Sequence, residues 1–119
     1  MMNKLYGELR GWGCDVDGAL ERGINDDELY LACLQSIAHD ETFFSLGDAL
    51  RAGDNERAFD CAHTLKGVLA NLGLTPIYDI VVRIVEPLRA KSAEGVMEEY
   101  EKLLAARERL EKTIGKYVN

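Results

Sequence analysis

Hydrophobic residues recur every three to four positions along most of this chain, and glycines, prolines and acidic residues separate one such stretch from the next. Because an α-helix turns once in about 3.6 residues, this spacing predicts a chain built from helices. The predicted helices, in chain order, span about residues 2–9, 15–22, 26–37, 41–52, 54–73 and 75–88, with a last one after Ser92. We therefore expect an all-α fold.

Capping residues and prolines define several of these helix ends. Asp26 and Asp54 stand where their carboxylates would accept hydrogen bonds from the first free backbone N–H groups of the following helices. Thr75 is the expected cap of the next helix, with Pro76 at its first position, where a missing N–H is tolerated. Pro87 should kink that helix near its end, because proline interrupts the hydrogen bonds of a helix interior.

The helix at about residues 54–73 has one apolar face and a histidine on the opposite face. At about 100° per residue, a set of hydrophobic side chains falls within about 60° of one direction and forms the expected buried stripe. The stripe comprises Ala58, Cys61, Ala62, Leu65, Val68, Leu69 and Leu72. His63 lies about 160° from Leu65, so we expect its imidazole to face solvent.

His63, Lys66 and Gly67 together indicate a phosphoryl-acceptor site. An imidazole nitrogen is nucleophilic near neutral pH, and its attack on a phosphoryl donor gives a phosphoramidate that can be passed on. Lys66 is close enough on the helix surface to offset the charge of phosphoryl oxygens. Gly67 lies one turn beyond His63, where a side chain would crowd the imidazole and an approaching partner. Glycine costs about 1 kcal/mol relative to alanine in a helix interior, which suggests that this space is used.

One motif contains this histidine, a second follows it on the same helix, and two further segments lie nearer the N-terminus. They are Ala62-His63-Thr64-Leu65-Lys66-Gly67, Ala70-Asn71-Leu72-Gly73-Leu74, Asp15-Val16-Asp17-Gly18-Ala19-Leu20 and Asp27-Glu28-Leu29-Tyr30. With these residues the chain closely resembles the histidine-containing phosphotransfer family of two-component phosphorelays, over most of residues 10–115. The resemblance implies an antiparallel four-helix bundle with short additional N-terminal helices.

The resemblance also implies a function. His63 would accept a phosphoryl group from a receiver aspartate, or from a kinase, and donate it to a receiver aspartate of a response regulator. The implied partners are receiver domains of response regulators, a hybrid histidine kinase, or both, with the direction of net flow left open. In many relatives a polar residue of the next helix approaches the acceptor histidine, whereas an ungapped count places Val85 at that position.

The outward face of the histidine helix is the expected docking surface for a receiver domain. Phe59 and Ala70 would offer apolar contacts on either side of Gly67, and Lys66 and Asn71 would add polar contacts. In an alternative interpretation Phe59 packs against a neighbouring helix, because the apolar stripes of bundle helices are often wide.

Composition and charge narrow the class of protein. A chain of 119 residues and 13.3 kDa suits a single domain, residues 1–119, that can close its own core as a monomer. A formal net charge of −7 without a basic cluster argues against a nucleic-acid partner. No apolar run approaches the roughly 20 residues of a membrane span, and no signal-peptide core is present, so we expect a cytoplasmic location. Met1 and the helical pattern near Asn119 favour a free-standing chain over a fragment of a hybrid kinase.

Other kinds of chemistry find little support in the sequence. No glycine-rich phosphate loop, paired-carboxylate constellation or metal cluster of cysteine and histidine is recognisable, so we expect a phosphoryl carrier, not an enzyme, with no cofactor and no metal. Cys14, Cys33 and Cys61 are odd in number and widely spaced, which indicates free thiols. Cys14, near a glycine-rich turn, is the one that could be reactive.

Two other classes of function stay open, together with a second histidine. The chain could be an adaptor that keeps the phosphotransfer fold and binds a receiver without transfer, an interpretation supported by Val85. It could also be an ordinary helical bundle in which His63 is incidental. His39, followed by Asp40, weakly resembles the acceptor box of histidine-kinase dimerisation helices, but a histidine in a turn between two helices is the better interpretation.

Overall fold

The structure is a computed structural model that describes residues 2–24 and 26–118. These residues contain seven helices. They are α1 (Met2–Trp12), α2 (Val16–Glu21), α3 (Asp27–Ala38), α4 (Thr42–Arg51), α5 (Asn55–Asn71), α6 (Thr75–Arg89) and α7 (Val96–Gly115). No strand occurs within these residues, so the all-α prediction is confirmed.

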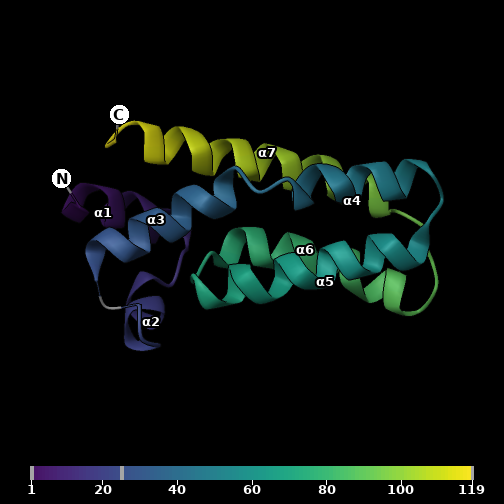
Figure 1. Cartoon of the computed structure of the whole chain (residues 1–119), viewed down its shortest axis with the longest axis horizontal. Helices are drawn as coiled ribbons and strands as arrows, with labels where there is room; N and C mark the ends of the chain where they lie inside the picture. The colour runs from purple at the N-terminus through teal and green to yellow at the C-terminus, as the bar shows by residue number, and fades with distance from the viewer. Residues whose placement is uncertain (1, 25, 119) are drawn as a thin grey trace.

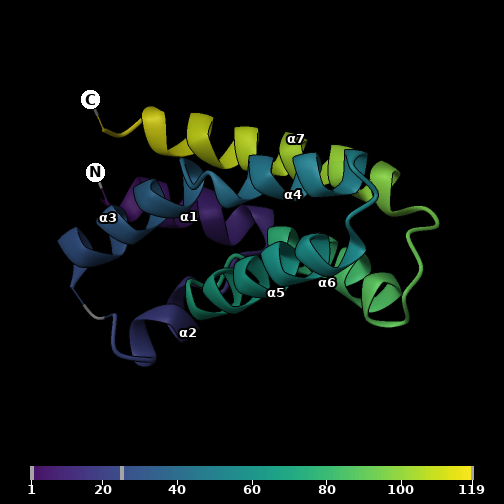
Figure 2. The ribbon, with the colours of Figure 1, turned by 45° about the vertical axis from the view of Figure 1, so that its right-hand side comes forward.

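The helices α4, α5, α6 and α7 pack as an antiparallel four-helix bundle, as expected (Figure 1). The 20-residue α7 is about 30 Å long at 1.5 Å per residue, which lets it contact α4 along one half and α3 along the other. The short helices α1 and α2 lie at the end of the bundle where both chain termini are found (Figure 2). The turn between α5 and α6 lies at the same end of the bundle as α1 and α2.

The predicted aspartate caps are confirmed, but the predicted threonine cap is wrong. The carboxylate of Asp26 accepts a hydrogen bond from Glu28 N at 2.8 Å, and that of Asp54 accepts one from Arg57 N at 3.1 Å. Thr75 instead belongs to α6 already. The preceding Leu74 occupies the cap position without a side-chain hydrogen bond, because its apolar side chain is buried in the core.

α1 runs further than its sequence signals suggested, whereas α6 ends within one residue of its expected end. α1 continues through Gly11 to Trp12, where the Arg109 guanidinium lies 4.4 Å from the centre of the indole ring. This contact between α1 and α7 offsets the cost of one glycine in the extra turn, because each contributes about 1 kcal/mol. α6 passes through Pro87 and ends two residues later at Arg89.

The buried stripe of α5 is narrower than its sequence predicts. Ala58, Ala62, Leu65, Leu69 and Leu72 are buried, whereas Cys61 is half-buried and Val68 is 38% exposed. The expectation that Val68 is buried was therefore wrong. The reason is length: α4 has ten residues against the 17 of α5, so it covers only part of this flank, and α3 then packs against α7.

Candidate functional site

His63 lies in the middle of α5, on the face that points away from the bundle core. The side chain is exposed, as expected, while its neighbours Ala62 and Leu65 are buried beneath the helix. Within residues 2–24 and 26–118, no hydrogen bond or ion pair involves the imidazole. Both ring nitrogens are thus available to a reacting group from outside the chain.

One aromatic contact supports the imidazole. The rings of Phe59 and His63, one turn apart on α5, have centres 5.6 Å apart and planes inclined by only 9°. Offset, near-parallel rings at this distance attract one another by about 0.5–1.5 kcal/mol beyond the area that they bury. The Phe59 ring is half-buried and packs against the hydrophobic core, and the guanidinium of Arg89 lies 5.3 Å from its centre.

The role of Arg89 was missed by the sequence analysis. Arg89 is the last residue of α6, and Phe59 is near the start of α5, so the antiparallel packing of the two helices brings them together. No local motif signals this contact. It depends on the relative register of two helices, which hydrophobic periodicity does not determine.

Lys66 and Gly67 occupy the turn that follows His63. The Lys66 side chain is half-buried and forms no ion pair with any residue in the described part of the chain. A Cβ atom built at Gly67 would have no heavy atom within 4 Å, the imidazole included. The expectation that a side chain here crowds the imidazole is therefore wrong for a methyl group, and the open space lies toward solvent and any approaching partner.

Val85 offers His63 no polar contact, because its side chain is apolar, and it is completely buried in the core. The position that the family resemblance associates with a polar neighbour is thus part of the packing between α6 and the other helices. The equivalence of Val85 to that position stays a prediction from the ungapped count. The face of the imidazole, contacted by Phe59, is the part of the ring that the chain supports.

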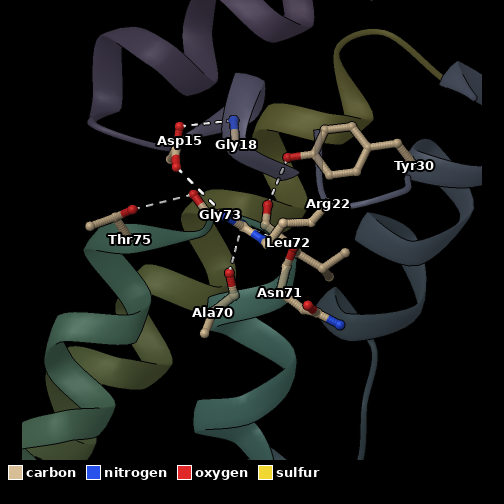
Figure 3. A network of polar contacts seen from close by, with 9 residues as sticks. All are labelled: Asp15, Gly18, Arg22, Tyr30, Ala70, Asn71, Leu72, Gly73 and Thr75. Atoms are coloured by element: carbon tan, nitrogen blue, oxygen red, sulfur yellow. Dashed lines mark hydrogen bonds and ion pairs between the residues drawn. The ribbon is translucent and has the colours of Figure 1, made fainter. Parts of the chain in front are cut away.

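Ala70 and Asn71 lie at the C-terminal end of α5, beyond Gly67. Both side chains are exposed, but their backbone carbonyl oxygens accept hydrogen bonds from the Arg22 guanidinium, at 2.9 Å and 3.2 Å (Figure 3). The last carbonyl groups of a helix carry partial negative charge, which a guanidinium offsets. This end of the predicted docking face is therefore held against the residue that follows α2.

Two further contacts fix the same helix end. The buried Tyr30 hydroxyl donates to the Leu72 carbonyl oxygen at 2.8 Å, and the Asp15 backbone N–H donates to the Gly73 carbonyl oxygen at 2.7 Å (Figure 3). Gly73 has a φ of +69°, and a Cβ built there would overlap the Asp15 carbonyl group. Only glycine fits at this position.

A shallow cleft of about 560 Å³ opens beside Phe59, between the start of α5 and the end of α6. Its walls combine apolar surface with charges of both signs. The lining residues are Asn55, Glu56, Phe59, Leu88, Arg89 and Lys91. Within the described part of the chain, no group of three or more histidine, cysteine or acidic residues is placed to hold a metal ion.

The other candidate residues lie outside this site. His39 caps the end of α3 in a turn, as the sequence indicated, with its Nδ1 atom 3.1 Å from a Glu111 carboxylate oxygen. Cys14 is buried, and burial raises the pKa of its thiol to about 11, so the thiolate is scarce near neutral pH. The expectation that Cys14 could be reactive is therefore wrong.

Fold and site together define a helical bundle that presents an accessible nucleophilic histidine in the middle of one helix. A family model described as Hpt domain matches residues 33–113, more than half of the chain. The chain therefore belongs to the Hpt domain family, whose members are phosphocarrier modules of two-component signalling. Neither the search of curated proteins nor that of solved structures gives a match.

The family match begins within α3, so α1 and α2 lie outside it. Among the helices of residues 2–24 and 26–118, none is long and apolar enough to cross a membrane. The N-terminal segments that resembled the family in sequence are thus not covered by the family model, although they pack against its last helix and its central helix.

Proposed function

We propose that this protein is a phosphorelay intermediate in which His63 is the phosphoacceptor. A ring nitrogen attacks the phosphorus of a receiver aspartyl phosphate, the new N–P bond forms as the bond to the aspartyl oxygen breaks, and the carboxylate leaves. The reverse step passes the group to the receiver aspartate of a response regulator. The observation that carries the proposal is an exposed His63 imidazole that forms no polar bond within the described chain.

The neighbours of His63 have supporting roles in this proposal. Lys66 reduces the repulsion between incoming phosphoryl oxygens and the acidic protein, because its ammonium is not engaged in an ion pair with the described residues. Gly67 leaves room for the receiver above the helix. Phe59, Ala70 and Asn71 remain the proposed docking residues, on either side of Gly67 along α5.

The partners, on this proposal, are receiver domains of response regulators, a hybrid histidine kinase that itself supplies the ATP chemistry, or both. We also propose that residues 1–119 act as one domain, as a monomer and in the cytoplasm. The single-domain proposal is supported by the N-terminal helices, since Leu5, Leu9, Val16 and Ala19 belong to the same buried cluster as the bundle helices. Light scattering on the full chain tests the monomer.

Intact-mass analysis after mixing the protein with phosphorylated receiver domains tests the acceptor directly. The wild-type chain should gain one acid-labile phosphoryl group and pass it to a second receiver, and His63→Ala should gain none. His39→Ala is the matched control, because it removes the other of the two histidines. Labelling of His63→Ala, or loss of labelling only in His39→Ala, would overturn the assignment.

A second candidate function follows from Val85. With an apolar, buried side chain at that position, the chain lacks a polar neighbour for the imidazole there, as an adaptor that only binds receivers would. Calorimetry measures binding of the same receivers, and intact-mass analysis of the same mixtures measures phosphorylation of His63. The two measurements together separate the two functions. Binding of a receiver without phosphorylation of His63, across all receivers tried, would favour the adaptor over the carrier.

A further inference from the structure

The imidazole of His63 is oriented by a ring face and not by a polar contact. Its ring lies nearly parallel to that of Phe59, with 5.6 Å between centres and 9° between planes. No hydrogen bond or ion pair within the described residues reaches the imidazole, and Val85 is buried away from it. An exposed histidine without such a neighbour would sample several side-chain rotamers. The Phe59 ring therefore restricts which of them His63 adopts.

Stacking restrains an imidazole without using its nitrogen atoms. The nitrogen lone pair that attacks phosphorus lies in the plane of the ring, whereas a stacked neighbour covers a face of the ring. A hydrogen bond from a polar neighbour would orient the ring equally well but would engage one nitrogen. A phenyl ring leaves both nitrogens of His63 free at the ring edge.

The Phe59 ring is itself held in place by two elements. It packs against the hydrophobic core from α5, and the guanidinium of Arg89, at the end of α6, lies 5.3 Å from its centre. Arg89 also contacts the Glu86 carboxylate, at 3.7 Å, within α6. The ring that supports the acceptor is thus fixed to two helices of the bundle.

We propose that Phe59 is a positioning residue for phosphoryl transfer, which stacks on the His63 imidazole and holds its nitrogen edge toward solvent, and that Arg89 secures the Phe59 ring. This role rests on the proposed function of His63 as the acceptor. It differs from docking, because it acts on the imidazole before any receiver arrives. A small phosphoryl donor that makes no protein contact should therefore detect it.

Phosphoramidate is such a donor: the His63 nitrogen attacks phosphorus, the bond from phosphorus to the ammonia nitrogen breaks, and ammonia leaves. Phe59→Leu should lower the phosphorylation rate about two- to tenfold, the range that loss of one aromatic contact allows. Phe59→Tyr, which keeps the ring, should restore the rate. Phe44→Leu is the matched control, because Phe44 is exposed on α4 with the Arg107 guanidinium 5.3 Å from its ring centre and no imidazole beside it.

Nuclear magnetic resonance supplies a readout that a merely structural role would not change. The ring protons of His63 should move to higher field in wild type and Phe59→Tyr than in Phe59→Leu, because they lie over an aromatic ring only in the first two. Circular dichroism should show equal helix content in all variants. Arg89→Gln, which keeps the stack and loosens its support, should have a smaller effect of the same sign on rate and chemical shift. It provides the test if Phe59→Leu fails to fold.

Equal phosphoramidate rates in wild type and Phe59→Leu would overturn the positioning role. Normal phosphoramidate labelling of Phe59→Leu with slow transfer from a receiver would also overturn it, because Phe59 would then act in docking. Both results leave the phosphorelay function intact. If wild type accepts phosphoryl from phosphoramidate but from no receiver, the proposed function fails, while the comparison of variants still decides whether Phe59 positions the ring.

Discussion

The middle and the C-terminal end of α5 differ in how the chain holds them. At the end, Arg22, Tyr30 and Asp15 donate hydrogen bonds to consecutive carbonyl groups, from Ala70 to Gly73. In the middle, the outward face bears an imidazole with one aromatic contact and no polar bond among the described residues. The helix is therefore fixed at a distance from the acceptor, which leaves the reacting group free of bonds that a partner would have to break.

Two glycines make the same difference visible. Gly73 adopts a φ of +69° and lies so close to the Asp15 carbonyl group that a side chain has no room. Gly67 is in regular helix, and a Cβ atom there would meet nothing within 4 Å. The first glycine is required by the fold, whereas nothing in the fold requires the second. If selection keeps Gly67, the reason lies in a partner.

Gly73→Ala is expected to have the largest effect on stability. The substitution combines a left-handed backbone conformation with overlap against the Asp15 backbone, and should lower the free energy of unfolding by about 2–5 kcal/mol. Urea denaturation of the full chain measures this loss. The turn between α5 and α6 must shift to admit the methyl group.

Gly53→Ala is the matched control for that overlap. Gly53 has a φ of +70°, close to that of Gly73, but no heavy atom within 4 Å of a Cβ position. The free energy of unfolding of Gly53→Ala should fall by only about 1–2 kcal/mol, the cost of the left-handed backbone conformation for alanine. Equal losses in the two variants would mean that the contact with Asp15 adds nothing, and that the end of α5 is held less firmly than we infer.

Tyr30→Phe should have the next largest effect. It removes the hydroxyl that donates to the buried Leu72 carbonyl oxygen and leaves that oxygen without this donor, at a cost of about 1–3 kcal/mol in the free energy of unfolding. Tyr78→Phe is the control, because the half-buried Tyr78 forms no hydrogen bond through its hydroxyl with the described residues. Phosphoramidate labelling of His63 should be the same in both variants. A slower rate in Tyr30→Phe would show that the two regions are coupled.

Much of the fold was predictable because its signals are local. Asp26 and Asp54 cap the helices as expected, and the apolar spacing of α5 correctly placed His63 on the outside. The width of the buried stripe was not predictable, because the exposure of Val68 depends on how far α4 extends along α5. Periodicity gives the direction of a helix face but not the length of its neighbour.

The site divides in the same way. Phe59 and His63 are four positions apart, so their contact is one that helical spacing allows. The contact of the Arg89 guanidinium with the Phe59 ring depends on the register between α5 and α6, which the sequence pattern does not give. Arg22 lies 48 positions before Ala70, and nothing in the sequence near either residue indicates that they meet. Contacts between elements far apart in the chain were therefore the ones missed.

Gly67→Ala should have the smallest effect on stability, and of opposite sign. Alanine replaces glycine in an open helical position, so the free energy of unfolding should rise by up to about 1 kcal/mol. Transfer from a receiver should nevertheless slow, because the methyl group enters the space over the helix, while labelling by phosphoramidate should stay at the wild-type rate.

Gly7→Ala is the matched control, because Gly7 lies in α1 with nothing within 4 Å of a Cβ position and is outside the acceptor helix. It should gain similar stability without any change in transfer. Stopped-flow transfer from a phosphorylated receiver, set beside urea denaturation of the same variants, measures both quantities. A Gly67→Ala protein that is more stable and transfers at the wild-type rate would show that the open space serves no partner. A loss of stability would show instead that the middle of α5 is constrained by the fold after all, and the contrast with its C-terminal end would disappear.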